Sequence, residues 1–233
     1  MIDIIKILSR LSEDSTFLDK VNSFGKFYKG MNGYDKLFSD VRIHSKRYCR
    51  MVDLLKETNR TEFSSCLEIG CNTGVLSMHV KSAFPETEVI ATDISERQIK
   101  MNKFFESFFK NGVEFENFSG QDMPHSMRNR FDLVFLCEIL EHLEPESGIQ
   151  RRVLEEAINS LTEQGLLIIT VPYEDRIPSP GHLTEFSSQS LTKLIAKCTD
   201  NFIELDEMRE KLNLQKHLIF LAAKPKHLAH FLL

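Results

Sequence analysis

The residues best suited to chemistry form a turn of small residues, Gly70 to Gly74, which follows the apolar run 66–69. The residues after the turn have helical spacing, so the pattern predicts a strand, a tight turn and a helix. Small residues let the backbone approach a ligand closely, and a helix begins with unpaired N–H groups. A second apolar run, 89–92, ends in Asp93, at a strand tip where a carboxylate can bind the two hydroxyls of a ribose. Together these residues predict a pocket for a nucleoside cofactor.

A second group of residues suited to chemistry follows the apolar run 131–136. If a helix begins there, Glu138, Glu141 and His142 stand at i, i+3 and i+4 and share one face. Two carboxylates and an imidazole can hold a divalent cation, and the oxygen ligands favour Mg²⁺ or Mn²⁺. His182, in a later loop, is the candidate for a fourth ligand. The alternative is that both histidines only make structural hydrogen bonds.

Three motifs, in their order and spacing, resemble those of the class I S-adenosylmethionine-dependent methyltransferases. They are EIGCNTG at 68–74, TD at 92–93 and FDLVF at 131–135. The resemblance covers roughly residues 65–224. A dinucleotide-binding turn would need a third glycine, which Leu76 and Ser77 do not supply. Asn72 stands where the family more often has glycine, but asparagine tolerates positive φ, so the turn can still form.

The resemblance implies S-adenosylmethionine as cofactor and gives roles to residues around the turn. Glu68 would support the turn, and Asp93 would bind the ribose. Asp122 would accept a hydrogen bond from the adenine amine while Met123 covers the ring. The alternative for Asp122 is an ordinary surface turn. The expected cofactor contacts are Glu68, Gly70, Cys71, Asn72, Gly74, Asp93, Ile94, Gln121, Asp122, Met123 and Cys137.

The E-x-x-E-H pattern with a later histidine is similar to two metal-using branches, the ubiquinone-pathway O-methyltransferases and the small-RNA 2′-O-methyltransferases. The RNA branch usually has a further histidine close to the later one, and this chain lacks it around His182. Many metal-free relatives keep the Glu-His pair for structural hydrogen bonds, so a site with Mg²⁺ and a metal-free site both stay open. The metal ligands would be Glu138, Glu141, His142 and His182. His142 and His182 are the candidates for the catalytic base, or for ligands of a metal that lowers the pKa of the acceptor.

Strands and helices alternate from residue 65 onward, which predicts an α/β fold with a mostly parallel, doubly wound sheet and ligands at the carboxyl ends of its strands. Strands are predicted at 65–70, 88–92, 113–117, 131–136, 166–171, 201–207 and 217–223, and helices at 73–83, 96–109, 149–162 and 188–197. The last two strands are close enough in sequence to pair antiparallel. The resemblance implies a Rossmann-like seven-stranded sheet with the order 3-2-1-4-5-7-6 and the last strand antiparallel.

Residues 1–60 have helical periodicity and are predicted to form an N-terminal helical cap, with 61–233 as the cofactor-binding methyltransferase domain. In the resembling family such helices close over the cofactor and line the acceptor site, and the alternative is a packing role without chemistry. The cap contains a basic run made of Arg42, His44, Lys46, Arg47 and Arg50. This run is either a solvated helix face or a surface that binds an anionic acceptor.

The composition narrows the classes of function. Apolar residues make up 42% and charged residues 27%, as in ordinary soluble domains, and the net charge of −5 gives no support to nucleic-acid binding. No apolar run is long enough to span a membrane, and the N-terminus does not read as a secretion signal. Five cysteines, an odd number, indicate a reduced cytoplasmic protein. The apolar tail 225–233 is expected to pack on the domain or on the second subunit of a homodimer.

The sequence therefore predicts a methyltransferase that acts on a small molecule, with oxygen as the expected acceptor atom. Three alternatives are kept. An RNA 3′-terminal 2′-O-methyltransferase would need a basic groove and a metal. An NAD-dependent oxidoreductase would need the missing glycine. A non-catalytic subunit would bind S-adenosylmethionine and transfer nothing.

Overall fold

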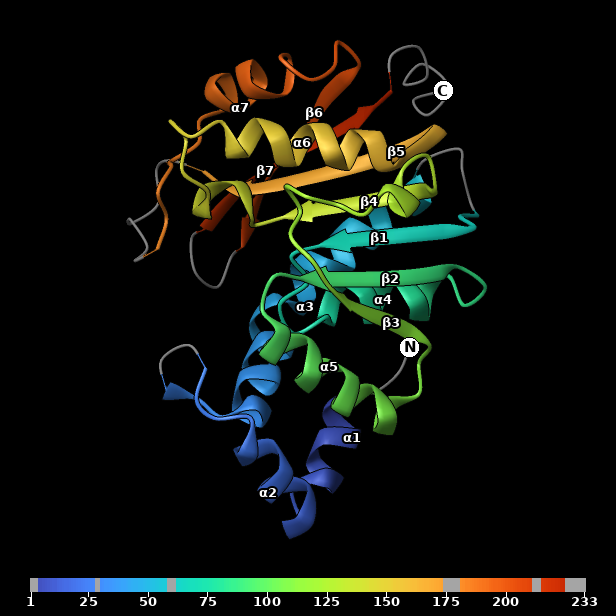
Figure 1. Ribbon diagram of the computed structural model, residues 1–233, viewed down its shortest axis with the longest axis vertical. Helices are drawn as coiled ribbons and strands as arrows, with labels where there is room; N and C mark the ends of the chain where they lie inside the picture. The colour runs from blue at the N-terminus through green and yellow to red at the C-terminus, as the bar shows by residue number, and fades with distance from the viewer. Residues whose placement is uncertain (1–3, 28–29, 58–61, 174–180, 211–214, 225–233) are drawn as a thin grey trace.

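A seven-stranded mixed sheet, with the order β3-β2-β1-β4-β5-β7-β6, forms the centre of the computed structural model (Figure 1). The structure describes residues 4–27, 30–57, 62–173, 181–210 and 215–224. The strands are β1 (Ser65–Ile69), β2 (Glu88–Asp93), β3 (Val113–Asn117), β4 (Phe131–Cys137), β5 (Leu161–Pro172), β6 (Phe202–Glu210) and β7 (Gln215–Ala223). Strands β1 to β5 pair in parallel, and β7 runs antiparallel to β5 and β6. The predicted Rossmann-like sheet and its strand order are confirmed.

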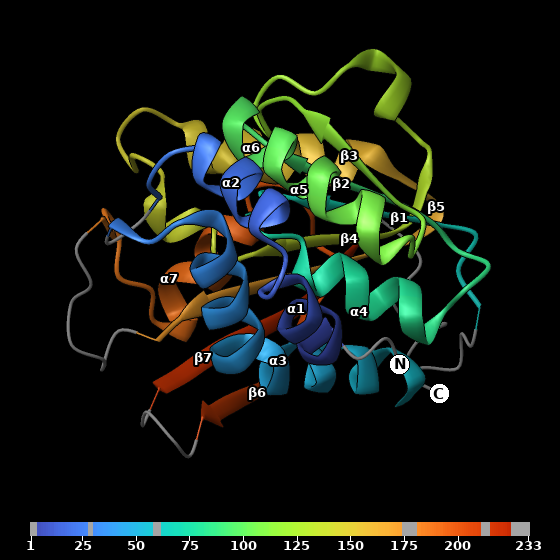
Figure 2. The same cartoon turned by 90° about the horizontal axis from the view of Figure 1, so that it is seen from below.

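Helices cover both faces of this sheet (Figures 1 and 2). They are α1 (Ile4–Leu11), α2 (Ser15–Ser23), α3 (Gly33–Glu57), α4 (Val75–Ala83), α5 (Glu96–Phe109), α6 (Ile149–Ser160) and α7 (Ser188–Ile195), with 3₁₀ turns η2 (His125–Met127) and η3 (Leu140–His142). One buried hydrophobic cluster packs the five helices α1 through α5 against one face of the sheet and includes Phe17, Met51 and Phe105. A second cluster joins α6 and α7 to the other face and includes Leu154 and Leu191. The division into a cap and a domain near residue 60 stays a prediction.

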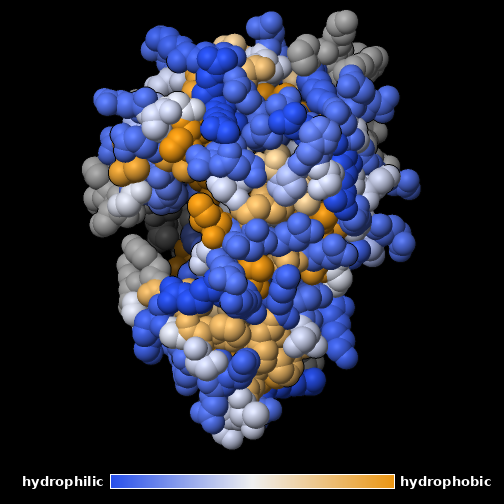
Figure 3. Space-filling view, in the orientation of Figure 1, coloured by the Kyte–Doolittle hydropathy of each residue, from blue (hydrophilic) through white to orange (hydrophobic). Residues whose placement is uncertain are grey.

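The carboxyl ends of β1, β2 and β4 lie together at one edge of the sheet, on the left of Figure 1. Ile69 of β1 pairs with Thr92 of β2 and with Leu136 of β4, so the segments that follow these strands leave the sheet side by side. The strand order reverses between β1 and β4, which is where doubly wound sheets bind ligands. The surface is hollowed at this edge in Figure 3.

The clearest boundary difference concerns β5, which begins at Leu161 rather than at the predicted residue 166. Leu161 pairs with Phe131 of β4, and this pairing ends α6 at Ser160. Gly165, which breaks the apolar pattern, lies inside β5. The position requires glycine, because a Cβ there would stand 2.7 Å from the backbone oxygen of Phe131. The tail 225–233 lies outside the described residues. Within those residues, no helix has the length and apolar character needed to cross a membrane.

Candidate functional site

The turn between β1 and α4 depends on left-handed backbone at three positions. Gly70, Asn72 and Gly74 have φ of 73°, 48° and 73°. Glycine adopts this conformation freely and asparagine tolerates it, so the prediction that Asn72 preserves the turn is confirmed. A Cβ on Gly70 would lie 2.1 Å from Ile139 Cδ1, and one on Gly74 would lie 2.5 Å from the ring of Phe115. Both positions therefore require glycine.

Asp93 joins the tip of β2 to this turn. Its Oδ2 accepts a hydrogen bond from Asn72 N–H at 3.0 Å, and its Oδ1 accepts one from Ser95 N–H at 2.8 Å. Cys71 N–H donates to Thr92 O at 2.7 Å and ties the turn to β2 a second time. A carboxylate has about four lone-pair sites, so about two are left for ribose hydroxyls. The turn and the carboxylate are brought together as predicted, and their contact with a cofactor stays a prediction.

The other expected cofactor contacts lie around the same edge. Ile94, beside Asp93, is 73% exposed and offers an apolar surface at the rim. Met123 is buried in the second core cluster, while Asp122 is exposed and its Oδ1 pairs with Arg152 of α6 at 2.8 Å. Gln121 is half-buried next to this pair. Both readings of Asp122, adenine ligand and surface turn, fit this position.

Glu68 is buried in β1 and binds the first turn of α4. Its Oε2 accepts from the backbone N–H of Ser77 at 3.0 Å and also from the Ser77 hydroxyl. The carboxylate therefore braces the turn between strand and helix, which is the supporting role expected of it. Burial raises the pKa of Glu68 to about 7, although the hydrogen bonds from Ser77 oppose this shift.

We expect the pKa of Glu68 to make the protein less stable as pH rises from about 4.5 to about 7. The folded protein keeps a proton on Glu68 that the unfolded chain releases, so the stabilisation is present below the unfolded pKa and is lost through the folded one. The loss amounts to about 3 kcal/mol for one such group. Glu68→Gln should flatten this part of the stability profile, measured by urea unfolding at pH 5 and pH 8. Glu163→Gln, at a side chain 80% exposed, is the control, and an unchanged slope in Glu68→Gln would contradict the assignment.

The start of α3 contacts the glycine turn through residues that the sequence analysis did not single out. The Thr73 hydroxyl donates to Asp40 Oδ2 at 2.7 Å, and the Asn72 side-chain amide donates to the same oxygen at 3.4 Å. Lys36 donates to the Asn72 side-chain oxygen and lies 3.5 Å from Asp40. Burial lowers the pKa of Lys36, while Asp40 opposes the shift. The only signal in the sequence was the i, i+4 spacing of Lys36 and Asp40, which is common on solvated helices.

The segment after β4 is not the predicted helix. β4 continues to Cys137, Glu138 has φ of 57°, and the 3₁₀ turn η3 follows. Glu138 therefore does not share a helical face with Glu141 and His142, and its carboxylate is bound by other residues. Glu138 therefore lies outside the group formed by Glu141, His142 and His182, and its predicted role as a metal ligand gains no support. Cys137, an expected cofactor contact, is half-buried with its Sγ 3.8 Å from Met51 Sδ.

Glu141, His142 and His182 do come together. One nitrogen or oxygen atom from each lies within 4.8 Å of the others. The two imidazole rings stand edge to face, with centroids 4.8 Å apart. His142 Nδ1 lies 2.8 Å from the carbonyl oxygen of Gly181, so Nδ1 carries the proton and the neutral ring has an unprotonated Nε2. The group can act as a base or as a small ligand set for a cation.

Arg47 lies in a buried ionic cluster with Glu138 and His217. Its Nη1 stands 3.2 Å from Glu138 Oε2 and 3.0 Å from His217 Nε2, and its side chain is 5% exposed. Both predicted roles of the basic run, a solvated face and an anion-binding surface, are therefore wrong for Arg47. Arg42 and Lys46 are exposed, as on a solvated face. The sequence analysis did not identify His217 as a member of this cluster, because its partners Arg47 and Glu138 are distant from it in the sequence.

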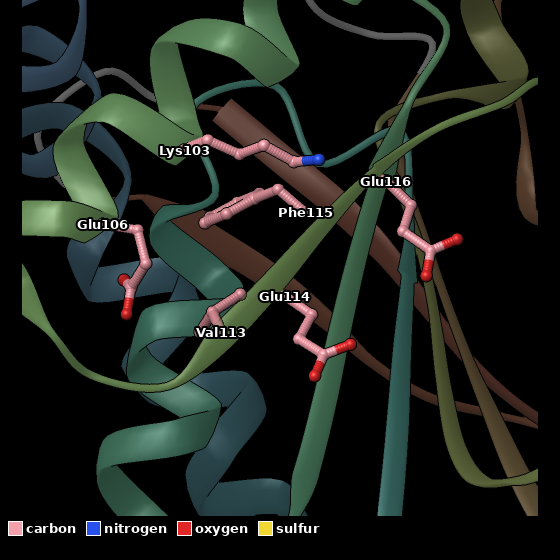
Figure 4. Close-up of a pocket in the computed structure, with 6 residues that line it drawn as sticks. All are labelled: Lys103, Glu106, Val113, Glu114, Phe115 and Glu116. Atoms are coloured by element: carbon pink, nitrogen blue, oxygen red, sulfur yellow. The ribbon is translucent and has the colours of Figure 1, made fainter.

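A second hollow lies away from the glycine turn, between α5 and β3, the outermost strand on one side of the sheet (Figure 4). Its volume is about 340 Å³, and it is lined by Lys103, Glu106, Val113, Glu114, Phe115 and Glu116. In Figure 4 the ring of Phe115 points toward the helix, while Glu114 and Glu116 point to the other side of the strand. None of the lining residues belongs to the predicted site, so this hollow is not the predicted cofactor pocket.

Comparison with known sequences finds similarity to methyltransferases. Residues 67–167 match a family described as a methyltransferase domain. Malonyl-[acyl-carrier protein] O-methyltransferase 2 of Ilyobacter polytropus is 24% identical over 200 residues, which cover 84% of this chain and 69% of the relative. Malonyl-[acyl-carrier protein] O-methyltransferase of Calditerrivibrio nitroreducens is 22% identical over 176 residues, which cover 74% of this chain and 63% of the relative.

Comparison with solved structures shows the same fold. The N-methyltransferase NodS of Bradyrhizobium japonicum, in complex with S-adenosyl-l-homocysteine, has a TM-score of 0.59 and 16% identity, with 77% of this chain and 86% of that chain covered. The 1,6-didemethyltoxoflavin-N1-methyltransferase of Burkholderia thailandensis has a TM-score of 0.63 and 16% identity, with 94% and 89% covered. The domain match, which covers less than half of the chain, and the curated relatives support a methyltransferase, and the solved structures show that this chain shares their fold.

Proposed function

We propose that this methyltransferase transfers a methyl group to an oxygen atom of a small-molecule acceptor. The observation that carries the proposal is the hydrogen bond from Asn72 N–H in the glycine turn to the carboxylate of Asp93. It lies at the point where the strand order reverses. Both curated relatives are named as O-methyltransferases, which supports oxygen as the acceptor atom. The net charge of −5 favours a small molecule over RNA.

The residues of the turn fit S-adenosylmethionine. When bound, it supplies a methyl group whose bond to sulfur breaks, with the electron pair left on sulfur, as the acceptor oxygen bonds to the methyl carbon. Asp93 offers its remaining lone pairs to the ribose, and Glu68 keeps the turn in shape through Ser77. α3 is attached to the turn through Lys36 and Asp40 and closes one side of it. The contribution of these groups is alignment, which converts an encounter into an effectively intramolecular reaction.

In this proposal the acceptor's proton passes to His142 or His182. The hydrogen bond from His142 Nδ1 to Gly181 O orients its ring and leaves Nε2 as the basic nitrogen. Imidazole is the side chain whose ordinary pKa suits proton transfer near neutral pH.

A divalent cation at Glu141, His142 and His182 is the second role proposed for this group. With Glu138 bound elsewhere, the ligand set is one carboxylate and two imidazoles. Two imidazoles suit a transition metal such as Zn²⁺ or Fe²⁺ better than Mg²⁺ or Mn²⁺, which prefer oxygen ligands. Such a cation would lower the pKa of an acceptor hydroxyl.

A binding and transfer panel tests the proposal. We expect S-adenosylmethionine and S-adenosylhomocysteine to bind in calorimetry and to raise the melting temperature, while NADH does neither. Radiolabelled methyl transfer is then measured to hydroxyl, amine and carboxylate small molecules and to an RNA 3′ end, with Zn²⁺ or with a chelator. Transfer to a small-molecule hydroxyl is the expected result.

Each alternative predicts a different pattern in this panel. NADH binding without S-adenosylhomocysteine binding would indicate an oxidoreductase, and transfer to RNA alone would indicate the 2′-O-methyltransferase. Cofactor binding without transfer to any acceptor would indicate a non-catalytic subunit. A transfer rate unchanged by the chelator would exclude the cation.

A cytoplasmic location and a homodimer complete the proposal. All five cysteines are free, and burial raises the pKa of the Cys66 and Cys71 thiols. Free thiols fit a reducing compartment. The apolar tail 225–233 motivates the dimer, and the elution volume in size-exclusion chromatography with light scattering tests it.

A further inference from the structure

Glu138 has an unusual backbone conformation at a central position. Its φ of 57° is left-handed, which is uncommon for a residue other than glycine and often marks a functional site. It directly follows β4, and its N–H donates to Thr170 O of β5 at 2.9 Å. The next residue, Ile139, packs against Gly70 so closely that Gly70 has no room for a Cβ. Glu138 is therefore fixed beside the predicted cofactor turn.

Side chains from three different elements surround the Glu138 carboxylate. Oε1 accepts from the Thr170 hydroxyl of β5 at 3.0 Å. Oε2 lies 3.2 Å from Arg47 Nη1 of α3 and 3.2 Å from His217 Nε2 of β7. Burial opposes ionisation of Glu138, but Arg47 and His217 outweigh it and hold its pKa well below its usual range.

The carboxylate is the most exposed member of this cluster. Its side chain is 19% exposed, whereas those of Arg47 and His217 are 5% and 1% exposed. About four lone-pair sites are available on a carboxylate, and Thr170 and Arg47 donate to two of them. His217 Nε2 occupies a third only in the tautomer that donates, because Arg47 Nη1 also lies 3.0 Å from it. At least one acceptor site is therefore left on the Glu138 carboxylate, the most exposed group of the cluster.

We propose that the Glu138 carboxylate faces the position of the transferred methyl group and accepts a hydrogen bond from the O–H of the acceptor. This inference rests on the proposed function and deepens it by naming the acceptor class. The acceptor is then a hydroxyl compound rather than a carboxylate, because an acceptor carboxylate would meet a like charge at this point. That separates this chain from the malonyl acceptor in the names of its curated relatives.

Sinefungin tests the placement of Glu138 without a known acceptor. In this S-adenosylmethionine analogue a carbon with a primary amine, protonated at pH 7, replaces the methylated sulfur. Calorimetry should show that the wild-type protein binds sinefungin roughly tenfold more tightly than S-adenosylhomocysteine, as expected for one charged hydrogen bond. Glu138→Gln should remove the preference and change S-adenosylhomocysteine affinity less than about twofold.

Glu156→Gln is the matched control. Glu156 lies on α6, pairs with Arg128 at 3.2 Å and has a side chain 15% exposed, so the change in charge and burial is similar. This variant should keep the sinefungin preference. If Glu138→Gln does not fold, Arg47→Met with Glu138→Gln removes both charges together and should lose the preference in the same way.

The outcomes separate this inference from the proposed function. Equal wild-type affinity for the two ligands, or a preference that survives Glu138→Gln, would overturn the placement of Glu138 while leaving the cofactor assignment intact. Failure of the wild-type protein to bind S-adenosylhomocysteine would overturn both.

Discussion

Replacing Asp93 with alanine should lower the affinity for S-adenosylhomocysteine on the order of 1,000-fold, because two hydrogen bonds to a charged group contribute about 2 kcal/mol each. The same carboxylate accepts the N–H groups of Asn72 and Ser95, so its loss also loosens the turn. Isothermal titration calorimetry on the purified variant measures the change, and the melting temperature without ligand reports whether the fold is intact.

Two variants separate the ribose contact from a general loss of charge. Asp93→Asn keeps one carbonyl acceptor and should lie between wild type and alanine. Glu88→Ala removes a carboxylate from the opposite end of β2, where it pairs with Arg130 at 2.7 Å, and should leave the affinity unchanged. If Asp93→Ala binds S-adenosylhomocysteine as tightly as wild type, the nucleoside pocket is not at this turn.

The elements that build this turn could be predicted because their signals are local. Predicted and observed bounds coincide for β3 (Val113–Asn117) and α5 (Glu96–Phe109). Gly70, Asn72 and Gly74 have left-handed backbone, which their residue types alone predict. The start of β5 was missed because Gly165 reads as a break, although it is the residue that allows close approach to Phe131.

The surroundings of Glu138 could not be predicted because their causes are distant in the chain. Helical spacing placed Glu138 with Glu141 and His142, but this spacing has meaning only if the backbone is helical. The left-handed conformation of Glu138 separates them, and its carboxylate is held by Arg47 and His217, which lie 170 positions apart. Tertiary ion pairing of this kind leaves no periodic signal in a single sequence.

The largest loss of stability is expected from Arg47→Met. The substitution keeps much of the apolar volume but leaves the carboxylate of Glu138 without its guanidinium, and breaking a buried ion pair in this way costs about 3–5 kcal/mol. In this variant the imidazole of His217, whose Nε2 lies 3.2 Å from Glu138 Oε2, still contacts the carboxylate. Urea unfolding followed by circular dichroism measures the change in the free energy of unfolding.

The source of this loss can be isolated with two further variants. Arg47→Met combined with Glu138→Gln should recover a large part of the stability, because no uncompensated charge is then left in the cluster. Arg128→Met removes an arginine that is 43% exposed and 3.2 Å from Glu156, and it should cost less than about 1 kcal/mol. An Arg47→Met protein no less stable than Arg128→Met would show that α3 is not held to the sheet by this cluster. The rigid placement of Glu138, and with it the acceptor class inferred from that placement, would then lose its physical basis.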